Sequence, residues 1–471
     1  MKRRTILTLL VVVLATALMA RPKPKYIFYM IGDGMGLNQV AATEMYLAEC
    51  DGYIGRKPLC MTSFPVTGLI TTFSESNGIT DSSAAGTALA AGVKTTNGTL
   101  GLTGKGEHYK TIAEQLHQNG WNIGIMTSVS IDHATPGAFY AHVTERSDYY
   151  TVGTQLPESE FEFFAGATFY KPYLENKPEA PNVYDLCNKA GYKFYHGYDD
   201  FINNGVGADR AILIQKHEGL ENTYLGKGNL PYAIDRKGDE LTLEQITDAA
   251  IVFLQKKEKP FFMMVEGGQI DWASHSNDAA TVIQETIDFD KAIRRAYKFY
   301  SEHPEETLIV VTADHETGGM ALGNHKYTLN LQLLQNQKAS VAAISDRLKK
   351  MKEEKGKKLT YDEVKALFQE TLGLYDVVEV SKDDDAKLRA TFKQMMKNKA
   401  HDTKTHYASL NALAAKAVQL LDRKAHIGWT TGAHSGAPVP VYAVGAGAEN
   451  FTGVYDNTEV MKRMLKLAEE D

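Results

Sequence analysis

The sequence predicts an α/β protein with a large, mostly parallel central sheet flanked by helices. Three near-continuous apolar runs, at residues 26–31, 261–265 and 308–312, are typical of strands that are buried on both faces. Each run leads directly into acidic residues, and helical patterns alternate with such runs along the chain. Because ligands collect beyond the carboxyl ends of the strands in such sheets, we expect a functional site at that edge.

The other elements continue this alternation. Further strands are expected at residues 121–128 and 439–444, and helices at residues 111–118, 282–300 and 409–421. Between residues 325 and 428 the pattern changes to helical spacing alone, at residues 329–334, 341–351, 360–372 and 386–396. Thr360 and Glu363 form a capping-box start within this block, which we interpret as a helical insertion.

Acid and imidazole side chains follow the three apolar runs. They lie in GDGMG (residues 32–36), VEGGQIDWASH (265–275) and TADHE (312–316), and are Asp33, Glu266, Asp271, His275, Asp314 and His315. Asp271 and His275 are four residues apart, so one helical turn places them on the same side. Mixed carboxylate and imidazole donors favour catalytic Zn²⁺, whereas carboxylates with a hydroxyl favour Mg²⁺. A single Asp-His pair is more often a cap or a surface contact, but three such strand ends together predict a metal centre.

The segment TDSSAAGTA (residues 80–88) supplies a candidate nucleophile. Its polar start, followed by small helix formers, predicts a helix N-terminus, where free backbone N–H groups and the helix dipole favour an anion. A serine at this position can meet a phosphate. The alternative is that Asp81 or Ser82 only caps the helix, and the nearby metal centre favours the catalytic interpretation.

These segments together resemble the alkaline phosphatase family. The matching stretches occur in the family's order and span most of the chain: residues 31–39, 80–101, 133–146, 265–275, 312–319 and 431–436. The resemblance implies an alkaline phosphatase-like fold, with a single domain over residues 21–471. Two variable insertions, at about residues 152–241 and 325–428, carry no family motif, and the second stands where family members shape access to the site or pairing of subunits.

The resemblance implies that Ser82 is the phosphorylated nucleophile. Ser83 is a neighbouring hydroxyl that competes for this role, but counting back from GVKT (residues 92–95) aligns Ser82 with the family's serine. Arg146 matches the family's phosphate clamp, in which a planar guanidinium grips two phosphoryl oxygens. Without the family, Arg146 reads as a solvated surface charge.

The resemblance also implies two Zn²⁺ and one Mg²⁺. The zinc that activates the serine would be bound by Asp33, Asp314 and His315. The second zinc would be bound by Asp271, His275 and His434. The Mg²⁺ would be bound by Asp33, Thr135 and Glu266, with Asp33 bridging. Two cations about 4 Å apart can clamp the attacking and leaving oxygens and activate bound water.

Two positions vary within the family. His133 stands where some members carry Asp and others His, and it would reach Mg²⁺ through water, which predicts weaker Mg²⁺ binding. Trp272 stands where other members place Lys or His, so we expect an aromatic wall in place of a polar phosphate contact. The acidic run at residues 383–385 is interpreted as a solvated turn rather than a Ca²⁺ site, because no EF-hand spacing follows.

The first residues predict export. MKRR (residues 1–4) and the apolar run at residues 6–18 form a signal peptide over residues 1–20, which implies a periplasmic or secreted protein. The three cysteines, Cys50, Cys60 and Cys187, permit at most one disulfide. Cys50 and Cys60 are close enough in sequence to pair, and free thiols are equally consistent with the sequence.

Composition excludes several classes of partner. The 471 residues, 43% hydrophobic and 23% charged, form an ordinary globular composition with an ample core. The formal net charge of -7 argues against a nucleic-acid binding surface or an anionic-membrane surface. We expect small-molecule phosphate monoesters as partners, no stable membrane anchor, and a homodimer by resemblance. The histidines outside the motifs, such as His108, are interpreted as surface or core groups.

Two other functional classes are distinguishable from a phosphatase. A mutase or phosphodiesterase of the wider superfamily shares the two-metal framework but lacks the combination of Asp81, Ser82 and Arg146. Isomerisation of a phosphosugar without phosphate release would identify such an enzyme. A metal-stabilised binding protein without catalysis is the second alternative, and the intact Ser82 and Arg146 argue against it.

Overall fold

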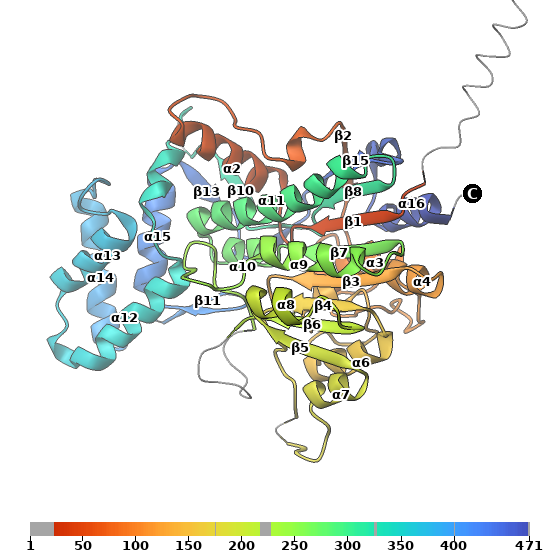
Figure 1. The fold of residues 1–471 in the computed structure, drawn as a ribbon. Helices are drawn as coiled ribbons and strands as arrows, with labels where there is room; N and C mark the ends of the chain where they lie inside the picture. Colours follow the sequence, from red (N-terminus) through yellow and green to blue (C-terminus); the bar gives the residue numbers. More distant parts are fainter. Residues whose placement is uncertain (1–22, 175, 217–227, 325–326, 400, 470–471) are drawn as a thin grey trace, which may run out of the picture.

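The computed structural model describes residues 23–174, 176–216, 228–324, 327–399 and 401–469. Its core is a ten-stranded sheet with helices on both faces (Figure 1). In order across the sheet, the strands are β16 (Gly453–Asp456), β2 (Val66–Thr71), β15 (Val439–Gly445), β8 (Thr307–Thr312), β1 (Tyr26–Ile31), β7 (Phe261–Glu266), β3 (Asn122–Thr127), β4 (Phe163–Gly166), β6 (Arg210–Ile214) and β5 (Tyr192–His196). Within this sheet the strands pair in parallel except for β15, which runs antiparallel to β2 and β8. The prediction of a mostly parallel central sheet is confirmed.

The central strands are buried because both of their faces are covered. Every residue of β3, β7 and β8 is buried, and β1 is buried after its first residue. This burial explains why their sequences are continuous apolar runs rather than alternating patterns. The strands predicted at residues 26–31, 121–128, 261–265, 308–312 and 439–444 are therefore all present.

Two groups of helices pack along the sheet. In one group, α11 (Ala279–Glu302) packs against three other helices, which are α2 (Leu37–Cys50), α9 (Leu243–Gln255) and α10 (Gln269–His275). The other group consists of α3 (Ser82–Ala91), α4 (Ile112–Gln118), α5 (Ala134–Gly137) and α16 (Thr458–Glu469). The helices predicted at residues 111–118 and 282–300 correspond to α4 and α11.

The first variable block extends the sheet. Its strands β4, β6 and β5 form one end of the sheet, and its helices are α6 (Tyr149–Ser159), α7 (Val183–Lys189) and α8 (Tyr198–Asn204). Elsewhere in the described part of the chain there are four short 3₁₀ helices: η1 (Met61–Ser63), η2 (Leu331–Asn336), η3 (Gly356–Lys358) and η4 (Ala448–Phe451). The segment predicted as helical at residues 329–334 corresponds to η2.

The second block is helical, as predicted, and forms the left end of the molecule in Figure 1. Its helices α12 (Val341–Lys355), α13 (Tyr361–Leu372) and α14 (Lys382–Met396) pack on α15 (Ala412–Lys424). The capping box of Thr360 and Glu363 begins α13. A hairpin of β11 (Thr403–Lys404) and β12 (Ser409–Leu410) leaves this block.

Two helix starts in this block were predicted wrongly. The acidic residues 383–385 are not a solvated turn but the first turn of α14, where the Ser381 side chain caps the helix and the dipole favours negative charge. The helix expected from residue 409 begins at Ala412, because Asn411 caps it and residues 409 and 410 pair as a strand. Caps and strand pairing, rather than apolar spacing, set both boundaries.

Two short ladders lie beyond the ends of the central strands. β9 (Glu316–Thr317) pairs with β14 (His434–Ser435), and β10 (Met320–Leu322) pairs with β13 (Ile427–Trp429). Because β15 runs antiparallel, its first residue lies at the same edge as the last residues of β1, β7 and β8. The segment before β15 therefore reaches the edge where ligands were expected.

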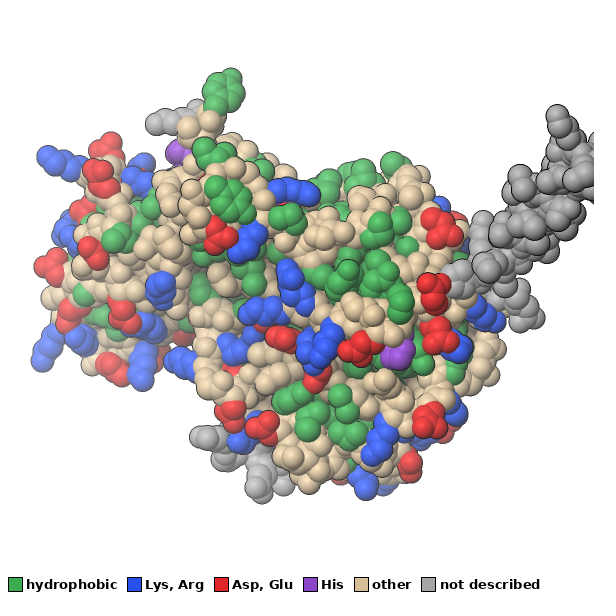
Figure 2. All heavy atoms as spheres, turned by 45° about the horizontal axis from the view of Figure 1, so that its top comes forward, with side chains coloured by type: hydrophobic (Ala, Val, Ile, Leu, Met, Phe, Trp, Pro, Cys, Tyr) green, Lys and Arg blue, Asp and Glu red, His purple; other side chains and the backbone are tan. Residues whose placement is uncertain are grey.

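All three cysteines are free thiols, with Cys50 exposed and the other two buried. Across the described residues, no helix combines the length and apolarity needed to cross a membrane. The predicted signal peptide lies outside the described residues. On the face shown in Figure 2, Lys and Arg side chains are interspersed with Asp and Glu.

Asp278 joins the start of α11 to the helical block. Its buried carboxylate accepts hydrogen bonds from the Thr281 N–H at 3.1 Å, the Gln337 amide at 2.8 Å and the Val341 N–H at 2.7 Å. We expect Asp278→Ala to lower the free energy of unfolding by roughly 3 kcal/mol, through a lost cap and unsatisfied buried donors. Urea denaturation measures this loss, and exposed Asp376→Ala is the control; equal midpoints in the two variants would contradict the expectation.

Candidate functional site

Three acidic residues meet at the carboxyl ends of adjacent strands. Asp33 follows β1 by two residues, Glu266 is the last residue of β7, and Asp314 follows β8 by two residues. The register keeps these ends level, since Ile31 pairs with Glu266 on one side and with Thr312 on the other. All three acidic side chains are fully buried. The strand-end site expected from the sequence is therefore brought together.

Gly34 permits the close approach of the β1 loop to α10. Its φ of +71° lies in the left-handed region, and a Cβ at this position would lie 2.8 Å from the Asp271 Cα atom. The Gly34 N–H donates to Asp314 Oδ1 at 3.1 Å. The glycine therefore fixes one oxygen of Asp314 and brings Asp33 close to Asp271.

Several buried carboxylate oxygens accept no hydrogen bond from the described residues. These atoms are Asp33 Oδ1, Glu266 Oε1, Asp271 Oδ2 and Asp314 Oδ2. Burying an uncompensated carboxylate is costly, and buried charges are normally paired or coordinate metals. The donor set of carboxylates and imidazoles therefore fits divalent cations.

The carboxylates also raise one another's pKa. Burial, reinforced by the neighbouring carboxylates, raises the pKa of Asp33 and Asp314 well above the ordinary value. Burial likewise raises the pKa of Glu266 to about 7, although the Thr127 hydroxyl donates to it. Without cations, these acids therefore favour their protonated forms.

A carboxylate and two imidazoles form a second group beside the strand ends. The His275 Nε2 atom lies 3.4 Å from Asp271 Oδ2, one turn away on α10. The His434 Nε2 atom, on β14, lies 3.6 Å from Asp271 Oδ1 and 3.2 Å from His275 Nε2. Burial acts to raise the pKa of Asp271, but the adjacent His275 and His434 rings outweigh it and leave the pKa well below the ordinary value.

The outer ring nitrogens of both histidines are held by backbone carbonyls. His275 Nδ1 lies 2.7 Å from the Gly432 oxygen, and His434 Nδ1 lies 2.8 Å from the Thr80 oxygen. A carbonyl oxygen only accepts, so both Nδ1 atoms carry a proton, and in the neutral rings both Nε2 atoms offer an electron pair. Such outer hydrogen bonds are typical of metal-binding histidines.

His315 links the acidic residues to the candidate nucleophile. Its Nε2 atom lies 3.2 Å from Asp314 Oδ2, 3.4 Å from Asp33 Oδ1 and 3.2 Å from Ser82 Oγ. The donor atoms of Asp33, Asp271 and His315 all lie within 4.8 Å of one another. The Ser82 hydroxyl therefore borders the group of ligands.

The two adjacent serines are in different environments. Asp81 caps α3 by accepting from the Ala84 N–H, and Ser82 is the first residue of the helix, where the dipole favours an anion. Ser83 Oγ donates to Asp81 Oδ2 at 2.7 Å. The Ser83 hydroxyl is thus engaged in the cap, and the Ser82 hydroxyl faces His315.

Arg146 lies beside the start of α3. Its Nη1 atom is 3.4 Å from Asp81 Oδ2, while Nη2 is 3.3 Å from His133 Nε2 and 3.4 Å from the Tyr407 hydroxyl. Its side chain is only 12% exposed, so it is not a solvated surface charge. The guanidinium is therefore positioned to bind an anion next to Ser82.

A third group of donors surrounds the second oxygen of Asp33. Thr135, on α5, lies with its hydroxyl 3.4 Å from Asp33 Oδ2. The donor atoms of Asp33, His133 and Glu266 lie within 4.8 Å of one another. Burial and the adjacent Arg146 hold the pKa of His133 well below its ordinary value, so its ring is neutral.

Two residues at the site were missed from the sequence. His406 and Tyr407, in the turn of the β11–β12 hairpin, return from the helical block to this edge. The Tyr407 ring stacks on Trp272 with centroids 4.4 Å apart and 15° between planes, and His406 stacks on His275 at 5.4 Å. No motif marks these positions, because only the folded hairpin brings them to the site.

Comparison with known proteins gives consistent relatives. The family model described as alkaline phosphatase matches residues 24–162 and 205–470. Alkaline phosphatase 3 of Bacillus subtilis (strain 168) is 29% identical over 451 residues, which cover 94% of this chain and 88% of that protein. The unmatched residues 163–204 lie inside the first variable block.

Solved structures agree in fold. The cold-active alkaline phosphatase of a psychrophilic Shewanella species has a TM-score of 0.78 and 26% identity, covering 94% of this chain and 100% of that one. A His-to-Asp mutant of the alkaline phosphatase from the Antarctic bacterium TAB5, with Mg bound in its M3 site, has a TM-score of 0.65 and 25% identity. It covers 96% of this chain and 100% of that one.

The raised pKa of Glu266 predicts a pH-dependent cost of the metal-free site. At low pH Glu266 is protonated, and its burial costs little free energy. As the pH rises from the ordinary pKa of 4.5 through the folded pKa of about 7, Glu266 ionises and the free energy of unfolding of the metal-free protein falls. In metal-free protein, Glu266→Gln should therefore increase stability at pH 8, by roughly 3 kcal/mol at most, and change it little below pH 5. Thermal unfolding of wild type and Glu266→Gln after chelation measures this difference. An equal effect of the substitution at both pH values would refute the prediction.

Proposed function

Because the chain belongs to the alkaline phosphatase family, we propose that it hydrolyses phosphate monoesters through a phosphoserine intermediate on Ser82. Family membership by itself makes the protein a phosphomonoesterase. The nucleophile and the metal set are the further parts of the proposal. The observation that carries them is the position of the Ser82 hydroxyl, at the start of α3 and 3.2 Å from His315 Nε2.

The proposed metal set follows the three groups of donors. One Zn²⁺ would be held by Asp33, Asp314 and His315. The other Zn²⁺ would be held by Asp271, His275 and His434. The Mg²⁺ would be held by Asp33, Thr135 and Glu266. When bound, these cations supply neutralisation of the buried carboxylates, a lower pKa for the serine hydroxyl and stabilisation of the leaving oxygen.

Ser82 performs the first chemical step. Its Oγ atom attacks phosphorus, the bond from phosphorus to the alcohol oxygen breaks, and the serine proton passes through solvent to the departing alcohol. Water then attacks the phosphoserine, which restores the Ser82 hydroxyl and releases inorganic phosphate. The free N–H groups at the start of α3 favour the negative charge of both phosphorylated species.

Arg146 holds the phosphoryl group during both steps. Its contacts with Asp81, His133 and Tyr407 fix the guanidinium beside Ser82. A fixed guanidinium binds two phosphoryl oxygens with little loss of side-chain entropy. The stacked rings of Trp272 and Tyr407 form the adjacent wall, so we assign Trp272 to substrate binding by contact rather than by hydrogen bonding.

His133 tunes the proposed Mg²⁺ site from outside the ligand set. A neutral imidazole adds no negative charge near Asp33 and Glu266, in contrast to an aspartate. The relative from TAB5 in which a histidine is replaced by aspartate carries Mg in its M3 site. We propose that His133 weakens Mg²⁺ binding here relative to a carboxylate, and that it acts through water.

The cellular setting is proposed from the sequence and the family. Residues 1–20 would direct export and be removed, which would leave a periplasmic or secreted enzyme. We propose a homodimer, with residues 325–428 shaping access to the site or pairing. The β11–β12 hairpin supports the first of these roles, because it brings Tyr407 to Arg146.

The different environments of the two serines predict different variants. Ser82→Ala should abolish the phosphoenzyme and lower the turnover of p-nitrophenyl phosphate by a thousandfold or more, on the order expected for a lost nucleophile. Ser83→Ala should retain the phosphoenzyme, because its hydroxyl only braces Asp81. Acid-quenched labelling with phosphate measures the intermediate, and labelling of Ser82→Ala but not of Ser83→Ala would reverse the assignment.

The zinc assignment makes a separate prediction. His434→Ala should lose about one zinc per chain, because it removes one of three ligands from the Asp271 site. His406→Ala is the matched control, since His406 stacks on His275 without being a proposed ligand. Elemental analysis after dialysis measures the zinc, and an unchanged content in His434→Ala would exclude His434 as a ligand.

A further inference from the structure

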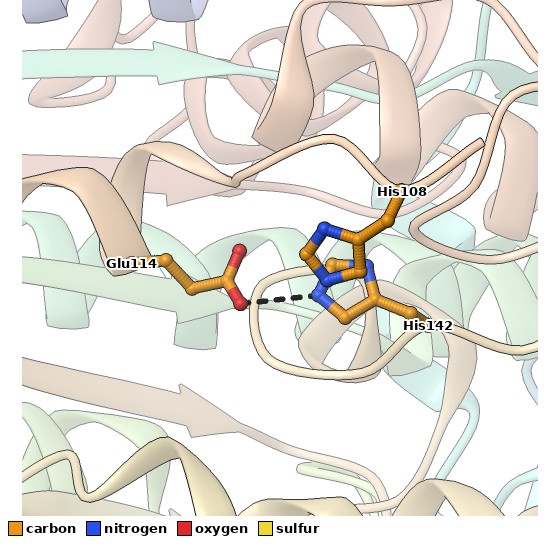
Figure 3. A group of neighbouring side chains, drawn as sticks. All are labelled: His108, Glu114 and His142. Atoms are coloured by element: carbon orange, nitrogen blue, oxygen red, sulfur yellow. Dashed lines mark hydrogen bonds and ion pairs between the residues drawn. The ribbon is translucent and has the colours of Figure 1, made fainter.

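A second group of metal-ligating side chains lies outside the active site. His108, Glu114 and His142 converge from three segments of the chain, with their donor atoms within 4.8 Å of one another (Figure 3). Glu114 is in the first turn of α4, His142 follows α5, and His108 lies in the loop before α4. None of these residues takes part in the proposed reaction.

The hydrogen bonds of His142 determine which of its nitrogens is free. Its Nδ1 atom lies 2.7 Å from the Gly101 carbonyl oxygen, which only accepts, so Nδ1 carries a proton. Its Nε2 atom lies 3.1 Å from Glu114 Oε1. In the neutral ring, two electron-pair donors therefore face each other, an arrangement that requires a proton or a cation between them.

Glu114 is held in place by its own helix. Its Oε2 atom accepts from the Thr111 N–H at 2.7 Å, and the Thr111 side chain accepts in return from the Glu114 N–H. This capping box fixes the carboxylate and leaves Oε1 directed at His142. The ligand arrangement is thus built before any ion arrives.

His108 completes the group with a second imidazole. Its ring centroid lies 3.7 Å from that of His142, and the backbone at His108 pairs with Leu102 across the loop. Figure 3 shows the His108 ring lying over the His142 ring beside the Glu114 carboxylate. Two imidazoles and one carboxylate are the donor types that suit Zn²⁺.

The charges of the group favour one divalent ion over two protons. Burial and the neighbouring His142 lower the pKa of His108. Burial acts against protonation of His142, but its hydrogen bonds to Glu114 and Gly101 raise the pKa overall. The contact between His142 Nε2 and Glu114 Oε1 needs one proton, and a divalent ion that displaces this proton would bind both rings in neutral form.

We propose that His108, Glu114 and His142 form a binding site for a divalent transition ion of the zinc class, with its remaining coordination position open to water. The ion would join the loop before α4 to the segment that leads to Arg146. These segments already pair, through Leu100 with Val143 and through the Arg146 N–H with the Gly98 oxygen at 2.7 Å. An ion bound here would stabilise the segment that positions Arg146, and its site is separate from the active-site metals.

The test counts zinc bound to the full-length enzyme. Wild type, Glu114→Gln and His142→Asn are dialysed against Zn²⁺, and zinc per chain is determined together with p-nitrophenyl phosphate hydrolysis. Glutamine preserves the capping box, and an asparagine amide can replace the Nδ1 donor, so both variants should fold and retain activity. Wild type should hold about one zinc more than either variant.

His117→Asn is the matched control, because His117 lies on the same helix and pairs with Glu162 at 3.5 Å. It should bind as much zinc as wild type. Equal zinc in wild type and in both site variants would overturn the proposal and leave a proton-bridged Glu114–His142 pair. An equal loss of zinc in the His117 control would also overturn the proposal, because it would show that zinc binds to surface histidines in general.

Calorimetry gives a second readout that does not depend on counting. Zinc binding to the active-site-loaded wild type should displace the proton between His142 Nε2 and Glu114 Oε1, seen as a dependence of the heat on the buffer. The same titration of His142→Asn should lose both the binding heat and the buffer dependence. Zinc binding without proton release in wild type would contradict the proposed ligation by His142.

Discussion

The cost of burying carboxylates governs the arrangement of this molecule. Asp33, Glu266 and Asp314 are fixed at one depth by the register of β7, β1 and β8, and each is removed from water. In a medium of low dielectric constant, these charges repel one another and favour protonation. The surrounding imidazoles and the proposed cations compensate for this one constraint.

Much of this arrangement could be predicted from the sequence because its signals are local. A buried parallel strand is an unbroken apolar run, and the first polar residues after it must lie at the carboxyl edge. Asp33, Glu266 and Asp314 follow from this rule alone. The start of α3 is also local, since Asp81 precedes a run of small helix formers and caps it.

The remaining features depend on contacts between distant segments. Tyr407 is an ordinary tyrosine in the sequence, and its place beside Arg146 arises only because the β11–β12 hairpin crosses to the sheet. The grouping of His108 with His142 likewise requires the loop before α4 to fold over the segment after α5. Helix starts such as that of α14 were misjudged because a capping serine outweighed apolar periodicity.

The reversed direction of β15 has a consequence for how the chain is completed during synthesis. β2 is made early, but its partners in the sheet are β15 and β16, which are among the last segments to leave the ribosome. His434 emerges just before β15, so the Asp271 group gains its second imidazole only then. A nascent or truncated chain thus has an unfinished sheet edge and lacks one imidazole of the proposed zinc site.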